Sequence, residues 1–138
     1  MRVEQLTLVV FRIGAGFLFF LHGLQKVFGL FGGRQVELAS LMGVAGMMEL
    51  VGGALVMAGF LTRPVAALLV IEMVVAFVKA HLPKGGWPIQ NGGELPLLYA
   101  LVFLYLAGNG AGAFSVDAWR RGRRGRVRNF VDDVRRAA

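Results

Sequence analysis

The amino-acid sequence predicts an all-α fold, an integral membrane bundle of four helices. The chain of 138 residues is 57% hydrophobic, above the roughly 45–50% typical of soluble domains, and its mean hydropathy is +0.65. Apolar residues gather in four segments of about the 20 residues that cross a ~30 Å hydrocarbon layer as a helix. Glycine, proline and charged residues separate these segments, which we place at residues 6–28, 40–60, 65–82 and 95–113.

Each segment has recognisable bounds. Arg12 interrupts the first apolar run and no small-residue cleavage pattern follows it, so we interpret residues 6–28 as a span and not as a cleaved signal. The second ends before "LTRP", whose Pro64 suits the first turn of the third helix. The fourth follows "PKGGWPIQNGGELP", a stretch whose prolines cannot sit inside a continuous helix.

A soluble four-helix bundle would need a charged face on every helix. The stretches "LVVFRIGAGFLFFL" and "AALLVIEMVVAFV" are apolar nearly all round. This excludes the soluble interpretation and leaves a bundle that lies in a lipid bilayer.

The net charge of +7 belongs mostly to the end of the chain. Residues 118–138 hold eight arginines and two aspartates, whereas residues 1–117 hold seven basic and six acidic groups. We therefore divide the chain into a bundle, residues 1–117, and a basic tail, residues 118–138. An even number of spans puts both termini on one side, with ten basic residues there against three on the other. The positive-inside rule then predicts a plasma-membrane protein with both termini in the cytoplasm.

The tail "RRGRRGRVRNFVDDVRR" has two interpretations. It is either a stop-transfer anchor that fixes topology or a binding surface. Such a surface would bind anionic headgroups, at about 1 kcal/mol per basic residue, or a soluble partner. No stacking aromatics interleave its arginines, so we expect no nucleic-acid binding.

Ionisable groups within the spans are the main functional signal. Each central charge costs roughly 2.5–3.5 kcal/mol to insert, while a leucine returns only about 0.3–0.6 kcal/mol. The spans hold three cationic and three carboxylate side chains, so we expect these groups to pair with one another inside the bundle. These six residues are Arg12, Lys26, Lys79, Glu49, Glu72 and Glu94.

Helical spacing places these charges on shared faces. Arg12 and Lys26 lie on one stripe of the first helix, and Gly46 and Gly53 flank Glu49 on the second, where small residues allow close approach. Glu72, Ala76 and Lys79 form a third stripe. By depth we place Arg12, Glu49 and Glu72 near mid-membrane. Closer to the outer face of the membrane lie His22, Lys26, Lys79, His81 and Glu94.

Two interpretations of this network stay open. The ion pairs either lock four helices together, or they line a polar pocket that binds a polar-headed apolar molecule or relays protons. His22 and His81 lie at the same depth, as a bis-imidazole haem would need, or are simply interfacial side chains. Two histidines without a further signature do not support haem, so we expect neither haem nor a metal site.

Several motifs resemble the DoxX family. They are "VVFRIGAGFLFFLHGLQKVFG", "MELVGGALVMAGFLTRPVA" and "VKAHLPKGGWPIQNGGELPLLYAL", which together cover roughly residues 7–117. DoxX-like proteins are small four-helix membrane proteins of bacteria and archaea. The family takes its name from a membrane subunit of a thiosulfate:quinone oxidoreductase or terminal quinol oxidase system. Many relatives are tied to quinone, catechol or thiol-stress responses.

The resemblance implies a set of motif positions that overlaps the charges above. Pro96 stands where alanine is more usual in the family. The chain has no cysteine, so a redox role would need a bound quinone or a partner protein. The implied positions are Arg12, His22, Gly23, Lys26, Glu49, Gly52, Thr62, Arg63, His81, Asn91, Gly92, Gly93 and Glu94.

We therefore expect a quinone site near the outer face, in a protein that would serve as the membrane subunit of a quinone-dependent oxidoreductase. Lys26 or His22 would hydrogen-bond a quinone oxygen, and Glu94 or His81 would transfer protons. Further ligand-binding positions are expected at Arg12, Glu49, Glu72, Lys79, Asn91 and Tyr99.

The alternative is a non-enzymatic scaffold that holds soluble redox or stress enzymes at the bilayer through the arginine tail. A small transporter is the weaker third hypothesis, because no span is a broken half-helix. Whether the chain forms a homo-oligomer is left open.

Overall fold

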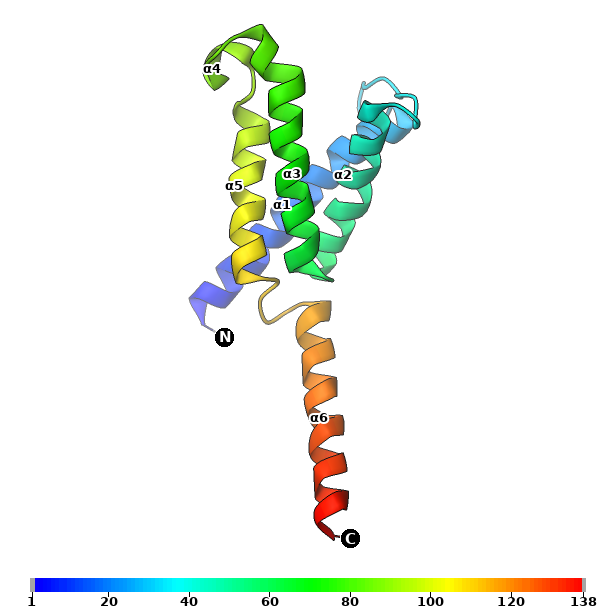
Figure 1. Ribbon diagram of the computed structural model, residues 1–138, viewed down its shortest axis with the longest axis vertical. Helices are drawn as coiled ribbons and strands as arrows, with labels where there is room; N and C mark the ends of the chain where they lie inside the picture. Colours follow the sequence, from blue (N-terminus) through cyan, green and yellow to red (C-terminus); the bar gives the residue numbers. More distant parts are fainter. Residues whose placement is uncertain (1, 138) are drawn as a thin grey trace.

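Four apolar helices pack together, and a basic helix extends away from one end of them (Figure 1). The computed structural model describes residues 2–137, and the side chains of residues 2–126 and 128. All regular secondary structure in that part of the chain is helical. The helices are α1 (Val3–Phe28), α2 (Leu41–Ala58), α3 (Thr62–Ala76), η1 (Phe77–His81), η2 (Leu82–Lys84), α4 (Pro88–Asn91), α5 (Glu94–Asn109) and α6 (Val116–Ala137).

Three helical stretches of the described chain are long and apolar enough to cross a membrane: Val3–Phe28, Leu41–Ala58 and Thr62–Lys84. This confirms the all-helical class of the described chain and gives three candidate membrane-spanning helices. The fourth predicted span is shorter than expected, because α5 has 16 residues and a length of about 24 Å at ~1.5 Å per residue. It ends at Asn109 and not at residue 113, since Gly110 leaves the helical conformation with φ 79°. A fourth crossing therefore stays a prediction.

Glycines let α1 and α2 approach to backbone contact. A Cβ at Gly23 would lie 2.3 Å from the backbone nitrogen of Leu50, and one at Gly53 would lie 2.7 Å from that of Phe20. Neither glycine tolerates a side chain, so the two helices form a hairpin held at close range. The close approach predicted for the glycines beside Glu49 is confirmed.

Aromatic side chains fill the core between α1, α3 and α5. The ring of Phe19 lies 4.7 Å from that of Phe103 and 5.0 Å from that of Tyr99, measured between centroids. Outward-facing positions carry large apolar side chains, including Leu18, Ile71 and Leu101, each more than half exposed. An apolar exterior of this extent suits lipid and not water.

The two ends of the bundle differ. At one end α3 continues into the wider turn η1, the short helix η2 and α4. At the other end the chain enters α1 and later leaves through α6 (Figure 1). The N-terminus and the start of the basic helix thus lie at the same end of the bundle.

Candidate functional site

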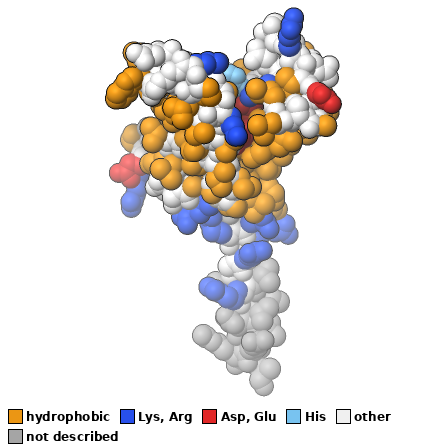
Figure 2. All heavy atoms as spheres, turned by 45° about the horizontal axis from the view of Figure 1, so that its top comes forward, with side chains coloured by type: hydrophobic (Ala, Val, Ile, Leu, Met, Phe, Trp, Pro, Cys, Tyr) orange, Lys and Arg blue, Asp and Glu red, His pale blue; other side chains and the backbone are white. Residues whose placement is uncertain are grey.

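A polar cavity of about 210 Å³ lies among α1, α2, α3 and α5, at the end of the bundle opposite α6. Figure 2 shows the hollow at this end, with acidic atoms inside it and basic and histidine side chains near its rim. Its polar lining comes from helices far apart in sequence and consists of His22, Lys26, Glu49, His81 and Tyr99. Its other walls are Phe19, Met73, Ala76, Gly92, Leu95 and Pro96. We call this space the polar cavity.

An ion pair between α1 and α2 forms one wall of the polar cavity. Lys26 Nζ lies 2.5 Å from Glu49 Oε1, and the Glu49 side chain is almost fully buried. Lys26 can reach Glu49 because Gly46 has no side chain: a Cβ at Gly46 would lie 2.9 Å from Cβ of Lys26. Among the residues whose side chains are described, this is the one salt bridge, so the predicted pairing of charges is confirmed for Lys26 and Glu49 alone.

Glu72 of α3 lies behind this wall. It is 7% exposed and does not line the polar cavity. Next to the two acids α2 and α3 pack closely, since a Cβ at Gly52 would lie 2.8 Å from Cδ2 of Leu69. Neither carboxyl oxygen of Glu72 has a hydrogen-bond partner, and Oε2 of Glu49 lacks one as well. Of the two buried carboxyl groups, Glu49 alone is paired with Lys26.

His81 reaches the polar cavity from the wide turn η1. Its Nδ1 lies 3.1 Å from the carbonyl oxygen of Asn91. A carbonyl oxygen only accepts, so this hydrogen bond requires a proton on Nδ1 and leaves Nε2 of the neutral ring as an acceptor. His81 can therefore receive a proton or a hydrogen bond from a molecule in the cavity.

Asn91 supports the loop and is not free to bind a ligand. Its Nδ2 donates to the carbonyl oxygen of Gly85 at 2.7 Å, and its Oδ1 accepts from the backbone nitrogen of Gly93 at 2.8 Å. The side chain is 5% exposed. Asn91 thus positions His81 and the start of α5.

Aromatic rings complete the polar cavity. The rings of His22 and Tyr99 meet edge to face at 6.0 Å, and Tyr99 stacks on Phe103 at 5.8 Å. These contacts hold a phenol and an imidazole side by side on α5 and α1. Five of the ten predicted site residues therefore line one space.

Besides Glu72 and Asn91, two more predicted residues lie outside the polar cavity and are exposed. Lys79 is exposed, because the extra residue in the wide turn η1 (Phe77–His81) shifts the helical phase and brings His81 to the face that Lys79 was expected to occupy. Glu94 is exposed at the first position of α5, where a negative charge is favourable next to the helix N-terminus.

Arg12 belongs to a separate cluster at the opposite end of the bundle. It is 1% exposed, and its Nη2 donates to the carbonyl oxygen of Phe114 at 2.7 Å. The expected grouping of Arg12 with Glu49 and Glu72 is not found. Gly59 makes room for the guanidinium, since a Cβ there would lie 1.7 Å from Nη1.

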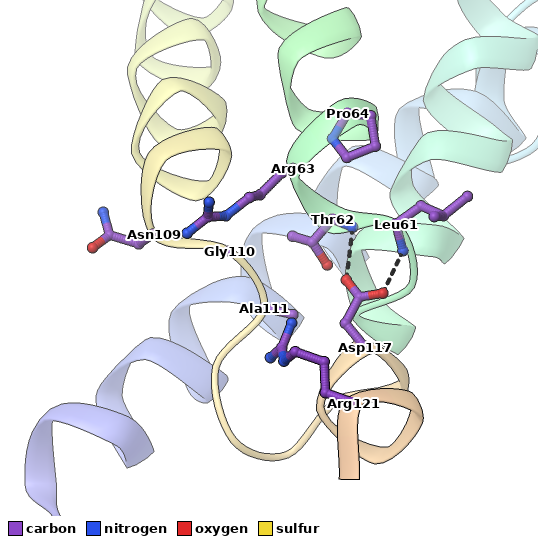
Figure 3. Close-up of a pocket in the computed structure, with 9 residues that line it drawn as sticks. All are labelled: Leu61, Thr62, Arg63, Pro64, Asn109, Gly110, Ala111, Asp117 and Arg121. Atoms are coloured by element: carbon purple, nitrogen blue, oxygen red, sulfur yellow. Dashed lines mark hydrogen bonds between the residues drawn. The ribbon is translucent and has the colours of Figure 1, made fainter. Parts of the chain in front are cut away.

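Asp117 joins α6 to this cluster (Figure 3). Its two carboxylate oxygens accept from the backbone nitrogens of Leu61 and Thr62, each at 2.9 Å. Burial alone would raise the pKa of Asp117, but the hydrogen bonds from Thr62 and Leu61 outweigh it and the pKa is lowered. Asp117 thereby caps α3 and stabilises Leu61, whose φ of 49° is unfavourable for a branched side chain. We call this cluster the α6 junction: Arg12, Gly59, Leu61, Thr62, Phe114 and Asp117.

The α6 junction borders the larger hollow of about 490 Å³, flanked by Arg63 and Arg121 (Figure 3). A helix N-terminus beside two arginines would suit an anion. Here the amides that would bind one already bind Asp117. The amide groups at this end therefore stabilise the fold by binding Asp117.

Comparison with known proteins places the chain in a family. The DoxX family model matches residues 7–82, more than half of the chain. The chain belongs to the DoxX family. A Haemophilus influenzae protein described as uncharacterized is 39% identical over 117 residues, 80% of this chain and 87% of its own. The Bacillus subtilis protein "Putative oxidoreductase CatD" is 30% identical over 118 residues, 82% of this chain and 86% of its own. No solved structure matches.

Sequence reasoning missed several residues of this DoxX protein. Phe19 shared the stripe of Arg12 and could have been found there, whereas Met73 and Pro96 gave no signal beyond being apolar. Asp117 contacts Leu61 across 56 positions of sequence. No local spacing reveals a contact of that kind.

Proposed function

We propose that this DoxX protein binds the ring of a quinone-like molecule in the polar cavity and serves as a membrane component of a redox or stress-response system. The observation that carries the proposal is the convergence of an ammonium, two imidazoles and a phenol on one small space in an apolar bundle. Ligand sites commonly combine apolar walls with a few placed polar groups.

The size of the polar cavity supports a ring and not a whole lipid-like molecule. Its 210 Å³ is below the roughly 300–1,000 Å³ of pockets that enclose drug-sized ligands. Lys26 and Tyr99 offer donors to the oxygens of such a ring, and Phe19 offers an apolar wall. The bound molecule would supply the redox chemistry, while these side chains hold and orient it.

An apolar groove of about 360 Å³ between α1 and α5 suits the tail. It shares Leu95 and Tyr99 with the polar cavity and continues along Gly14 and Leu18 on α1. An isoprenoid chain attached to the ring would leave through this groove into lipid. The name of the Bacillus subtilis relative, an oxidoreductase, supports a redox role.

Orientation is part of the proposal. Four crossings would bring the N-terminus and α6 to one side, and the arginines of α6 favour the cytoplasm. The polar cavity then lies in the outer half of the plasma membrane.

The proposal is tested by titrating long-chain and short-chain menaquinone analogues into the protein in nanodiscs. Gly14→Leu places an apolar side chain in the groove, at a position where a Cβ meets nothing within 4 Å. We expect it to weaken long-chain binding about tenfold, or ~1.4 kcal/mol, and to leave short-chain binding unchanged. Gly108→Leu is the matched control, because its Cβ also meets open space. Lys26→Met and His22→Ala should weaken both ligands; unchanged affinity in both variants would reject the site.

A second function, as a scaffold for soluble enzymes, is supported by α6. The helix stands away from the bundle (Figure 1), and among its described side chains five arginines are exposed. They are Arg121, Arg123, Arg124, Arg126 and Arg128. Affinity capture should recover soluble partners with the full chain and lose them after deletion of residues 118–138, which keeps Asp117. Equal recovery with both proteins would reject the scaffold.

A further inference from the structure

The cluster formed by Lys26, Glu49 and Glu72 does not balance in charge. Two carboxyl groups and one ammonium group would carry a net negative charge if all three were ionised. Glu49 is 3% exposed and Glu72 is 7% exposed, both on helices that pack inside the bundle. An uncompensated charge at such a depth is disfavoured.

The groups around the two acids do not supply a second fixed positive charge. His22 and Lys26 of α1 and Tyr99 of α5 line the same cavity as Glu49. His81 lines the same cavity but is turned toward the Asn91 carbonyl. Lys26 is thus the one permanent cation on the described side chains next to the pair.

The two acids are not equivalent. Glu49 is bonded to Lys26 at 2.5 Å through Oε1 and is thereby held as the ionised member. Glu72 has no hydrogen-bond partner on either oxygen. A carboxyl group that is buried without a donor is most stable in its neutral form.

We propose that Glu72 carries a resident proton, which it shares with Glu49, and that the pair is a proton-binding site behind the wall of the polar cavity. A proton satisfies the geometry better than a metal cation does, because metal cations need several oxygen ligands. In the part of the chain that the structure describes, no group of three or more histidine, aspartate or glutamate side chains could hold a metal.

Glu49 connects this proton-binding site to the polar cavity. It lines the polar cavity, whereas Glu72 does not. Transfer of the proton from Glu72 to Glu49 exchanges which carboxyl is charged and leaves the net charge of the cluster at zero. A proton on Glu49 can then pass to an acceptor in the cavity, and Nε2 of His81 is one such acceptor. This site does not depend on which molecule fills the cavity.

Infrared spectroscopy of the protein with isotope-labelled glutamate carboxyls, in nanodiscs at neutral pH, tests the charge count directly. The wild type should show one neutral carboxylic acid per chain, with a band that shifts in D₂O. Glu72→Gln and Glu49→Gln should each abolish the band, because one carboxylate and Lys26 then form a neutral pair. Lys26→Met should double it. Glu94→Gln, an exposed glutamate, is the control and should leave the band unchanged.

Three outcomes would overturn the proposal. They are a wild-type protein without a neutral acid band, a band that survives Glu49→Gln, and a band that disappears as sodium or potassium is raised at constant pH. The last would show a metal cation in place of the proton. The wild-type measurement alone decides the first and third outcomes even if a variant does not fold. Failure here leaves the menaquinone titration unaffected, so the two proposals are distinguishable.

Discussion

The two ends of this bundle both bury charged side chains but treat them differently. At the α6 junction, Arg12 donates to a backbone carbonyl and Asp117 accepts from two backbone amides. At the polar cavity, Lys26 pairs with Glu49, and three carboxyl oxygens of Glu49 and Glu72 have no hydrogen-bond partner. The α6 junction also buries atoms without partners, namely Nε and Nη1 of Arg12 and Oγ1 of Thr62. The two ends differ because both charged groups of the junction are bonded to the backbone, which holds elements in place, whereas the carboxyl groups at the cavity are not.

Because of this difference, we expect substitutions at the two ends to affect different properties, stability at one end and ligand affinity at the other. Changes at the α6 junction should lower stability and spare ligand affinity, because no ligand group is involved there. Changes that alter only the polar side chains of the cavity should do the reverse.

Gly59→Ala should destabilise the protein by about 3 kcal/mol. The φ of Gly59 is 67°, which costs an alanine roughly 1–2 kcal/mol, and its Cβ would lie 1.7 Å from Nη1 of the buried Arg12. The measurement is the thermal unfolding midpoint in detergent. Gly108→Ala is the matched control and should be neutral or stabilising by up to ~1 kcal/mol, since it adds a helix-favouring methyl in open space. Equal effects of the two variants would refute the packing argument.

Asp117→Ala should cost about 1–2 kcal/mol, the usual loss when a helix cap is removed. The variant leaves the amide groups of Leu61 and Thr62 without their acceptor. Chemical denaturation in mixed micelles would measure the loss, with quinone-analogue affinity recorded in parallel. A changed affinity would contradict the separation of the two ends.

The contribution of Asp117 should also depend on pH in one direction. Its folded pKa is lowered, so the stabilisation is fully present above the unfolded value of about 3.9 and is lost as the pH falls through the folded pKa. The stability difference between wild type and Asp117→Asn should stay constant around neutral pH and shrink below about pH 4. A difference that grows on acidification would reverse the assigned sign.

Glu94→Gln should have the smallest effect. Glu94 is exposed at the start of α5, where its interaction with the helix N-terminus is worth about 0.3–1 kcal/mol. Quinone-analogue affinity should remain within twofold of wild type. A tenfold loss would restore Glu94 to the catalytic role that the sequence suggested.

Much of the fold could be predicted from the sequence because apolar length and glycine spacing are local properties. They located α1, α2 and α3 and the close helix approach at the glycines beside Glu49. The polar cavity was predicted in part, since burial costs singled out Lys26 and Glu49 among six charges expected to pair, and the structure shows that these two pair with each other. The phase shift at the wide turn η1 displaced Lys79, and no sequence period encodes it.

The placement of Arg12 could not be predicted for a different reason. Charge counting assumed that buried ions neutralise one another, yet the hydrogen bond that Arg12 makes goes to the backbone carbonyl of Phe114, while its Nε and Nη1 have no partner. Backbone acceptors at loops such as residues 110–115 do not appear in a count of side-chain charges. Only the folded chain reveals them.

Native mass spectrometry of the protein released from its own membranes tests the central claim most directly. We predict one quinone-type molecule per chain in wild type and in Asp117→Ala, and its loss in Lys26→Met. Retention of the same molecule by Lys26→Met, or its absence from the wild type, would contradict the assignment of the polar cavity as the binding site.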